Sequence, residues 1–227
     1  MINKSYENLV VEKPWGSEYV IYKNDVLAIT HLDILYNNST SLHCHPNKKT
    51  GFILLSGTAE IQLGFYNRET LSAPSKTIIR PGLFHSTKAM SENGVRVLEF
   101  ETPIDKDDLV RFKDNYGREK QNYQGSYKIK KLDDSFLLFK DPDIGNPLVY
   151  NLGGVEIKLE KNNTLEGLKD QSLDTIIAVI EGGIRCKKTK KIVLGPGEVI
   201  KTGTLIKLAE VFEPDDYIKT LCVKRIN

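Results

Sequence analysis

The chain has 227 residues, of which 40% are hydrophobic and 27% are charged, with a formal net charge of +2. This length can bury one large core or two modules of about 100–125 residues each. The near-balanced charge argues against a nucleic-acid-binding surface, and no apolar run reaches the roughly 18 residues of a membrane span.

Apolar and polar residues alternate along much of the chain, for example in 58–65 and 155–160, which is the period of half-buried β-strands. Such short runs, separated by glycine, proline and asparagine, recur through the first hundred residues. We therefore expect an all-β sandwich or barrel rather than alternating strands and helices. Residues 105–112 are predicted to form a short helix with Asp105 as its N-cap.

The two halves of the chain repeat one order of turns. In each half a glycine turn follows an apolar strand and a Pro-Gly turn precedes a later strand, first at Gly57 and 81–82, then at Gly182 and 196–197. A polar stretch lies between the halves. The sequence thus predicts two β domains, at 1–118 and 135–227, joined by a linker at 119–134.

Three of the four histidines form a pattern typical of a metal site. His43 and His45 are two residues apart in a predicted strand, so their side chains share one face. His85 follows a glycine turn, and an antiparallel barrel can place it beside that pair. We predict that His43, His45 and His85 hold a divalent metal ion such as Zn, Mn, Fe, Co or Ni. The alternative is that His43 and His45 are structural or surface histidines that hold no metal. His31 has no second histidine two residues away, and we interpret it as structural.

The segments around these histidines resemble motifs of the cupin superfamily. The run from His43 to Gly57 follows the spacing G(X)5HXH(X)3–4E(X)6G, and Arg80–His85 approaches PXGXXH with its proline displaced by one residue. Three further strings are similar to the cupin module of type II phosphomannose isomerases: VEKPWGSEY at 11–19, SGTA at 56–59 and DDLVRFKDNYGR at 107–118. The resemblance covers about half of the chain, and it implies that the first domain is a cupin (jelly-roll) barrel. The second half resembles a cupin only by its turns, and we predict a second cupin barrel there from the repeated order of turns.

Two departures from the family pattern matter for chemistry. The second barrel is degenerate, because Ile200 takes the position that matches His85. In the first barrel, Thr50 takes the family's acidic ligand position, which leaves three neutral imidazoles unless Glu99, Glu101 or Glu60 reaches the metal. No catalytic base can be named from the sequence.

Three further residues are candidate substrate-binding groups. Lys13 offers a point charge to a phosphate and Trp15 a stacking face, whereas the alternative is a solvated Lys13 beside a Trp15 that caps the core. Arg111, carried by the resembling closing segment, can bind a phosphate bidentately, or it can form a surface ion pair with a nearby aspartate.

The resemblance implies a metal-dependent enzyme of the isomerase class in carbohydrate or surface-polysaccharide metabolism. Its substrate would be a sugar phosphate or nucleotide sugar, and its reaction an aldose–ketose isomerisation or an epimerisation. Two alternatives stay open: a three-histidine iron dioxygenase, and a non-catalytic sugar-binding or regulatory cupin. A homodimer is expected, because small barrels expose sheet surface.

The N-terminal residues lack the apolar segment and cleavage site of a signal peptide, and the three cysteines show no CxxC spacing. We therefore expect a cytoplasmic protein without disulfides, which binds neither membranes nor nucleic acid.

Overall fold

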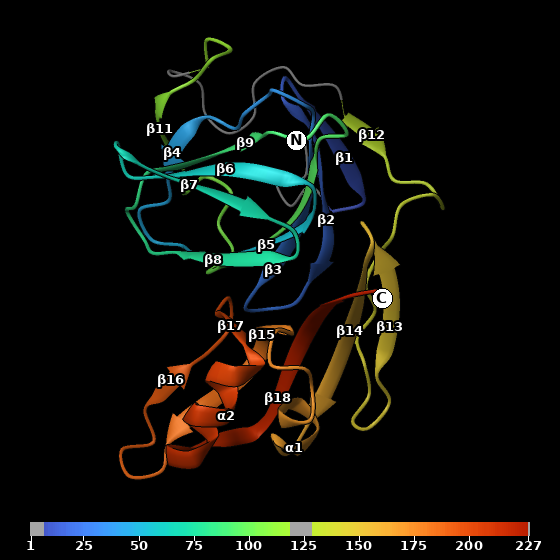
Figure 1. The fold of residues 1–227 in the computed structure, drawn as a ribbon, viewed down its shortest axis with the longest axis vertical. Helices are drawn as coiled ribbons and strands as arrows, with labels where there is room; N and C mark the ends of the chain where they lie inside the picture. The colour runs from blue at the N-terminus through green and yellow to red at the C-terminus, as the bar shows by residue number, and fades with distance from the viewer. Residues whose placement is uncertain (1–6, 119–128, 227) are drawn as a thin grey trace. The chain divides into compact units, whose positions relative to one another are not determined.

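The structure is a computed structural model that describes residues 7–118 and 129–226. The chain divides into two compact units, Met1–Phe139 and Lys140–Asn227, each of which consists mainly of strands (Figure 1). The all-β class is thus confirmed. Most of the predicted linker at 119–134 lies outside the described residues, but Ile129–Lys131 forms a strand of the first unit.

The first unit contains twelve described strands. They are β1 (Leu9–Lys13), β2 (Gly16–Lys23), β3 (Ala28–Ile34), β4 (Leu42–Cys44), β5 (Lys49–Ser56), β6 (Thr58–Leu63), β7 (Asn67–Ser72), β8 (Ser75–Ile79), β9 (His85–Ala89), β10 (Val95–Thr102), β11 (Val110–Lys113) and β12 (Ile129–Lys131).

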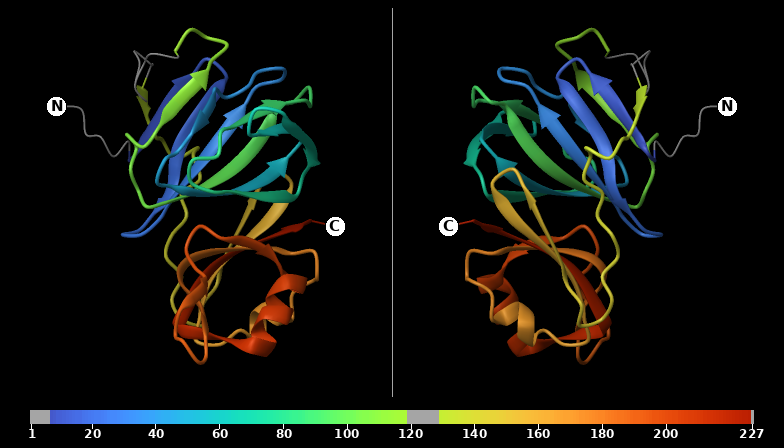
Figure 2. Two further views of the ribbon diagram at one scale, coloured as in Figure 1. Left: turned by 90° about the vertical axis from the view of Figure 1, so that its left-hand side faces the viewer. Right: turned by 90° about the vertical axis from the view of Figure 1, so that its right-hand side faces the viewer.

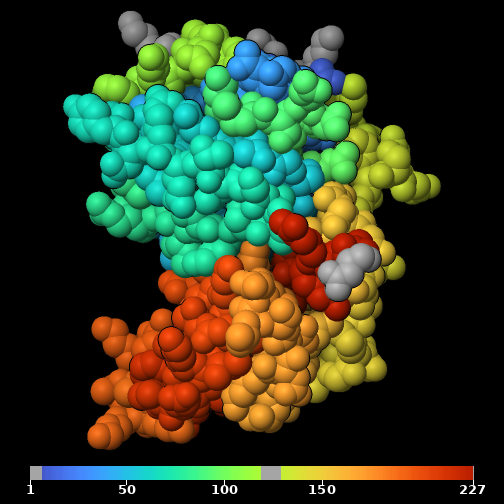
Figure 3. Space-filling model, viewed as in Figure 1, coloured from blue at the N-terminus to red at the C-terminus, as the bar shows by residue number. Residues whose placement is uncertain are grey.

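These strands form two antiparallel sheets. The larger has the order β12-β1-β2-β3-β10-β5-β8, and the smaller has the order β11-β4-β9-β6-β7. The views from either side show the two sheets on opposite sides of a common interior (Figure 2). In the space-filling view, cyan to green residues form most of the first unit's surface that faces the viewer (Figure 3).

The interior of the first unit contains an apolar core and a pocket lined partly by polar and charged side chains. Side chains from both sheets and from the β1–β2 turn form the apolar core, which includes Trp15, Leu54, Ile61 and Val97. Alternation explains this core, because each strand sends every second side chain inward. Other inward side chains are histidines, lysines and glutamates, and these line the pocket described below.

The helix predicted at 105–112 is wrong. The backbone N–H of Asp107 donates to the Asp105 side chain at 2.9 Å, which closes a turn, and strand β11 begins at Val110. An aspartate side chain can accept a backbone N–H at the start of a helix or within a turn. Asp105 as a candidate N-cap therefore did not distinguish a helix from a turn.

The second unit has one described sheet and two helices. Its elements are β13 (Leu148–Leu152), β14 (Val155–Asn162), α1 (Glu166–Lys169), β15 (Ile176–Cys186), β16 (Ile192–Leu194), β17 (Val199–Lys201), α2 (Thr202–Val211) and β18 (Phe212–Arg225). The sheet has six strands in the order β13-β14-β18-β15-β16, with β17 also paired to β15.

The predicted second cupin barrel is not confirmed, because the described part of this unit shows a single sheet. Leu168 of α1 and Leu205 of α2 pack with apolar side chains of that sheet, among them Ile177 and Ile218. Ile200 packs in the same cluster, so the position that matches His85 serves the core here. None of the described helices has the length and apolar character needed to cross a membrane.

Gly57 shows why the SGTA turn of the first unit requires glycine. Its φ is +78°, and an added Cβ would lie 2.6 Å from the carbonyl oxygen of Gly94. Gly64, at the other end of β6, has a similar φ of +71° with nothing within 4 Å of its Cβ position. The two glycines therefore share the same backbone conformation and differ in the space around them.

We expect Gly57→Ala to lower the free energy of unfolding by about 1–3 kcal/mol more than Gly64→Ala, because only the first adds an overlap with backbone. Trp15 is the one tryptophan of the chain and lies in this core, so denaturation followed by tryptophan fluorescence reports on the first unit. Equal losses in the two variants would contradict the close-packing argument.

Candidate metal centre

The three predicted ligands meet inside the first unit. His43 lies in β4 directly opposite His85 in β9, and the two are Cα partners in the antiparallel pair. His45 follows β4, where its carbonyl accepts a hydrogen bond from Gly82 N–H at 2.8 Å. The Pro81-Gly82 turn thereby ties the two histidine motifs together. One potential ligand atom from each ring lies within 4.8 Å of the others.

Backbone carbonyls orient all three imidazoles in the same sense. The Nδ1 atoms of His43, His45 and His85 lie 2.8, 2.6 and 3.0 Å from the carbonyl oxygens of Ser41, Asp108 and Leu83, respectively. A carbonyl only accepts hydrogen bonds, so each Nδ1 carries the proton. In the neutral rings Nε2 therefore keeps its lone pair, which is the arrangement that second-shell carbonyls produce in metal sites.

Burial keeps the rings neutral. It lowers the pKa of His85 to about 4, with a further contribution from His45. Burial likewise lowers the pKa of His43 and of His45 below the usual range. His85 Nε2 is buried without a hydrogen-bond partner among the described residues. Three convergent neutral imidazoles with available Nε2 atoms fit a divalent transition-metal ion.

The loop between β4 and β5 is held by one carboxylate. Asp108 accepts the backbone N–H groups of Asn47 and Lys48 at 3.1 and 2.9 Å, and the side-chain amide of Asn47 at 2.9 Å. Burial would raise the pKa of Asp108, but these hydrogen bonds outweigh it and lower the pKa. The carbonyl of Asp108 also orients His45. Hydrogen bonds therefore join the segment 107–118 to the loop that carries His45.

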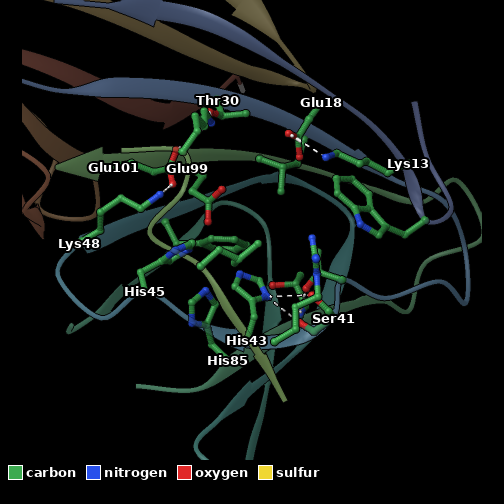
Figure 4. A pocket seen from close by; sticks show the side chains of 18 of the residues that line it. Lys13, Glu18, Thr30, Ser41, His43, His45, Lys48, His85, Glu99 and Glu101 are labelled. Atoms are coloured by element: carbon green, nitrogen blue, oxygen red, sulfur yellow. Dashed lines mark hydrogen bonds and ion pairs between the residues drawn. The ribbon is translucent and has the colours of Figure 1, made fainter. Parts of the chain in front are cut away.

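The histidines line a pocket together with all three predicted substrate-binding residues (Figure 4). Arg111 in β11 pairs with His43 in β4. Trp15 packs in the apolar core and also lines the pocket. Lys13 is not solvated, since its side chain is 3% exposed and its Nζ lies 3.4 Å from Glu18. The structure thus brings all six predicted site residues together.

Of the carboxylates that might reach the site, Glu99 and Glu101 line the pocket, whereas Glu60 pairs with Arg68 away from it. Thr50 is fully buried and is not among the residues that line the pocket, and its hydroxyl oxygen has no hydrogen-bond partner among the described residues. Within the described chain, the ligand cluster therefore consists of imidazoles alone.

Glu101 belongs to a buried ion network that sequence reasoning missed. Its carboxylate contacts Lys48 Nζ at 2.5 Å and Lys106 Nζ at 3.0 Å. Burial would raise its pKa, but the two ammonium groups outweigh burial and hold the pKa well below the usual range. The alternation of Glu99 and Glu101 in a predicted strand was a signal for two glutamates on one face, whereas nothing in the sequence marks the two lysines as buried.

Comparisons with known proteins relate the first unit to a protein family. Residues 3–114 match the family model described as "Mannose-6-phosphate isomerase C-terminal". The N-terminal half of the chain is a cupin domain similar to the cupin module of type II phosphomannose isomerases.

Two similar curated proteins are named for the biosynthesis of polysaccharides. "Xanthan biosynthesis protein XanB" from Xanthomonas campestris is 28% identical over 110 residues, which are 48% of this chain and 23% of XanB. "Alginate biosynthesis protein AlgA" from Pseudomonas putida is 24% identical over 131 residues, which are 57% of this chain and 27% of AlgA. The chain thus spans about a quarter of the length of these relatives.

Partial similarity to solved structures is also found. The capsular polysaccharide assembling protein CapF from Staphylococcus aureus has a TM-score of 0.43 and 15% identity, over 47% of this chain and 34% of CapF. KdgF from Halomonas sp. has a TM-score of 0.39 and 14% identity, over 42% of this chain and 86% of KdgF.

We expect purified wild-type protein to carry near-stoichiometric metal, and both His45→Ala and His85→Ala to lose it, because each removes one of three ligands. His31→Ala is the matched control: His31 is also buried, with a pKa lowered to about 4 by burial, but it lies outside the cluster. Elemental mass spectrometry measures the content. Full metal in both ligand variants, or wild-type protein that cannot be loaded with Mn, Fe, Co, Ni or Zn, would refute the site.

Glu101→Gln should lower the free energy of unfolding by about 3–5 kcal/mol, because it leaves two buried ammonium groups without their shared counter-charge. Glu60→Gln is the control, since it weakens an ion pair to the exposed Arg68 and should cost under about 1 kcal/mol. Denaturation followed by Trp15 fluorescence compares them. Similar losses would show that the buried network contributes no more than a surface pair.

Proposed function

We propose that the cupin domain is a metal-dependent enzyme that isomerises or epimerises a sugar phosphate or nucleotide sugar. The observation that carries the proposal is the set of three carbonyl-oriented imidazoles inside a pocket whose other charged residues are mainly cationic. The similarity to a phosphomannose isomerase domain supports the choice of substrate class.

The charge of the pocket suits an anionic substrate. Five cationic residues line it against three carboxylates, and the histidines are neutral. The cationic residues are Lys13, Lys48, Lys106, Arg111 and Arg118. Two of them, Lys48 and Lys106, are engaged with Glu101, and Arg118 forms a buried pair with Asp114 at 2.8 Å. We assign phosphate recognition to Arg111, whose strand pairs with that of His43.

When bound, a divalent ion would polarise a carbonyl or hydroxyl oxygen of the sugar. The chain's own groups supply the rest. His43, His45 and His85 would hold the ion, Arg111 would position the anionic group of the substrate, and Trp15 would offer an apolar face to the sugar ring. Such positioning supplies a large part of a rate enhancement, because it replaces random encounters by a fixed geometry.

One alternative has an observation in its favour. An all-imidazole ligand set, without a carboxylate, also fits an oxygen-activating iron site. Iron content together with oxygen consumption would favour that function, whereas conversion of a sugar phosphate without oxygen uptake would favour the isomerase. Metal and ligand binding without any conversion would point to a sugar-binding cupin.

We also propose a cytoplasmic homodimer. The three cysteines, Cys44, Cys186 and Cys222, are all unpaired thiols, which fits a reducing compartment. Light scattering of the purified protein measures the oligomeric state.

The proposal is tested by incubating metal-loaded protein with hexose 6-phosphates, including mannose 6-phosphate, and with nucleotide hexoses, while NMR follows the appearance of a new isomer. Conversion should stop after chelation and return with the metal. No conversion of any of these compounds by metal-loaded protein would refute the proposal.

Arg111→Ala should weaken binding of the converted substrate about 10- to 100-fold at unchanged metal content, because a charge-assisted contact to the phosphate is lost. Arg68→Ala is the matched control and should bind as the wild type does, because Arg68 pairs with Glu60 and is not among the residues that line this pocket. Calorimetry measures both affinities. Equal affinity in Arg111→Ala would remove this residue from the substrate site.

A further inference from the structure

Three carboxylates line the pocket, and two of them are engaged in ion pairs. Glu18 lies 3.4 Å from Lys13 Nζ, and Glu101 bridges two lysines. Paired carboxylates hold their counter-charges and are poorly suited to exchange a proton with a substrate, because each proton they accept disrupts a buried ion pair.

Glu99 differs from both. It lies in β10 two residues before Glu101, so the two side chains share the inward face of the strand. No hydrogen bond or ion pair joins its carboxyl group to another described residue. In Figure 4 it points into the pocket on the side of the histidines and carries no dashed line.

The surroundings of Glu99 also set its protonation near neutral pH. Burial and the negative charge of Glu101 together raise its pKa to about 8, against the opposing effects of Lys106 and Lys48. A carboxyl group with a pKa close to the working pH is accessible in both the acid and the base form, which is the property that general acid–base catalysis requires.

We propose that Glu99 is the catalytic residue that carries the proton between two neighbouring carbons of the sugar. This proposal rests on the function proposed above and supplies the base that the sequence could not name. As base, the Glu99 carboxylate takes the proton from the carbon beside the carbonyl; a C–H bond breaks, an O–H bond forms on Glu99, and the electron pair moves toward the carbonyl oxygen. In the enediolate that results, the proton of the neighbouring hydroxyl passes to the former carbonyl oxygen, and Glu99 returns its proton to the former carbonyl carbon. In an epimerisation the intermediate first turns in the pocket, and Glu99 returns the proton to the other face of the same carbon. In both cases no proton or electron is gained or lost overall.

The test compares Glu99→Gln, Glu99→Asp and the control Glu60→Gln, all loaded with metal, on the substrate that the wild type converts. Glu99→Gln should lower kcat about 10²- to 10⁴-fold, with metal content and substrate affinity within a fewfold of the wild type. Glu99→Asp should recover part of the rate, since it keeps the carboxyl group, and Glu60→Gln should match the wild type. A kcat in Glu99→Gln within a fewfold of the wild type would overturn this proposal and leave the proposed function standing.

A second measurement does not depend on turnover. Infrared difference spectroscopy of wild type against Glu99→Gln at pH 7 should show the carbonyl stretch of a protonated carboxylic acid in the wild type only. Absence of that band would overturn the role of Glu99 as the proton carrier. A wild type that converts no sugar compound would instead overturn the proposed function, and this proposal with it.

Discussion

The pairing of β4 with β9 is the constraint on which the rest of the site depends. It sets His43 opposite His85 across an antiparallel pair, while the Pro81-Gly82 turn bonds to the His45 carbonyl. Carbonyl oxygens then fix the tautomer of each ring. Because those carbonyls belong to segments just before β4, β9 and β11, the ligand geometry is a property of the folded barrel and not of the histidines alone.

Near this centre two carboxyl groups on the same face of β10 have opposite pKa shifts: the pKa of Glu99 is raised and that of Glu101 is lowered. Glu101 is held ionised by two buried ammonium groups, whereas Glu99, one step along the same strand face, has no such partner and a raised pKa. The difference follows from position. Lys48 lies in the loop before β5 and Lys106 in the loop after β10, and the ion pairs of both join Glu101. Environments that separate the pKa values of two adjacent carboxyl groups are typical of acid–base sites.

Thr50 clarifies how this domain departs from the pattern it resembles. The threonine is fully buried and lies opposite Glu101 between β5 and β10, without lining the pocket. The loss of the acidic ligand is therefore not repaired at that position. The carboxylates that do line the pocket come from β2 and β10, and the described cluster of potential ligands consists of imidazoles alone.

The sequence by itself determined the all-β class, the cupin resemblance of the first half and six of the residues around the pocket, namely His43, His45, His85, Lys13, Trp15 and Arg111. Those signals are local, since strand alternation, glycine turns and an HxH spacing are encoded within a few residues. Tertiary structure alone decided the rest: which carboxylates are paired, that Lys13 is buried, that 105–112 forms a turn and a strand, and that the described part of the second unit has one sheet with helices. Each of these depends on partners distant in the chain, and burial against such partners sets both conformation and charge state.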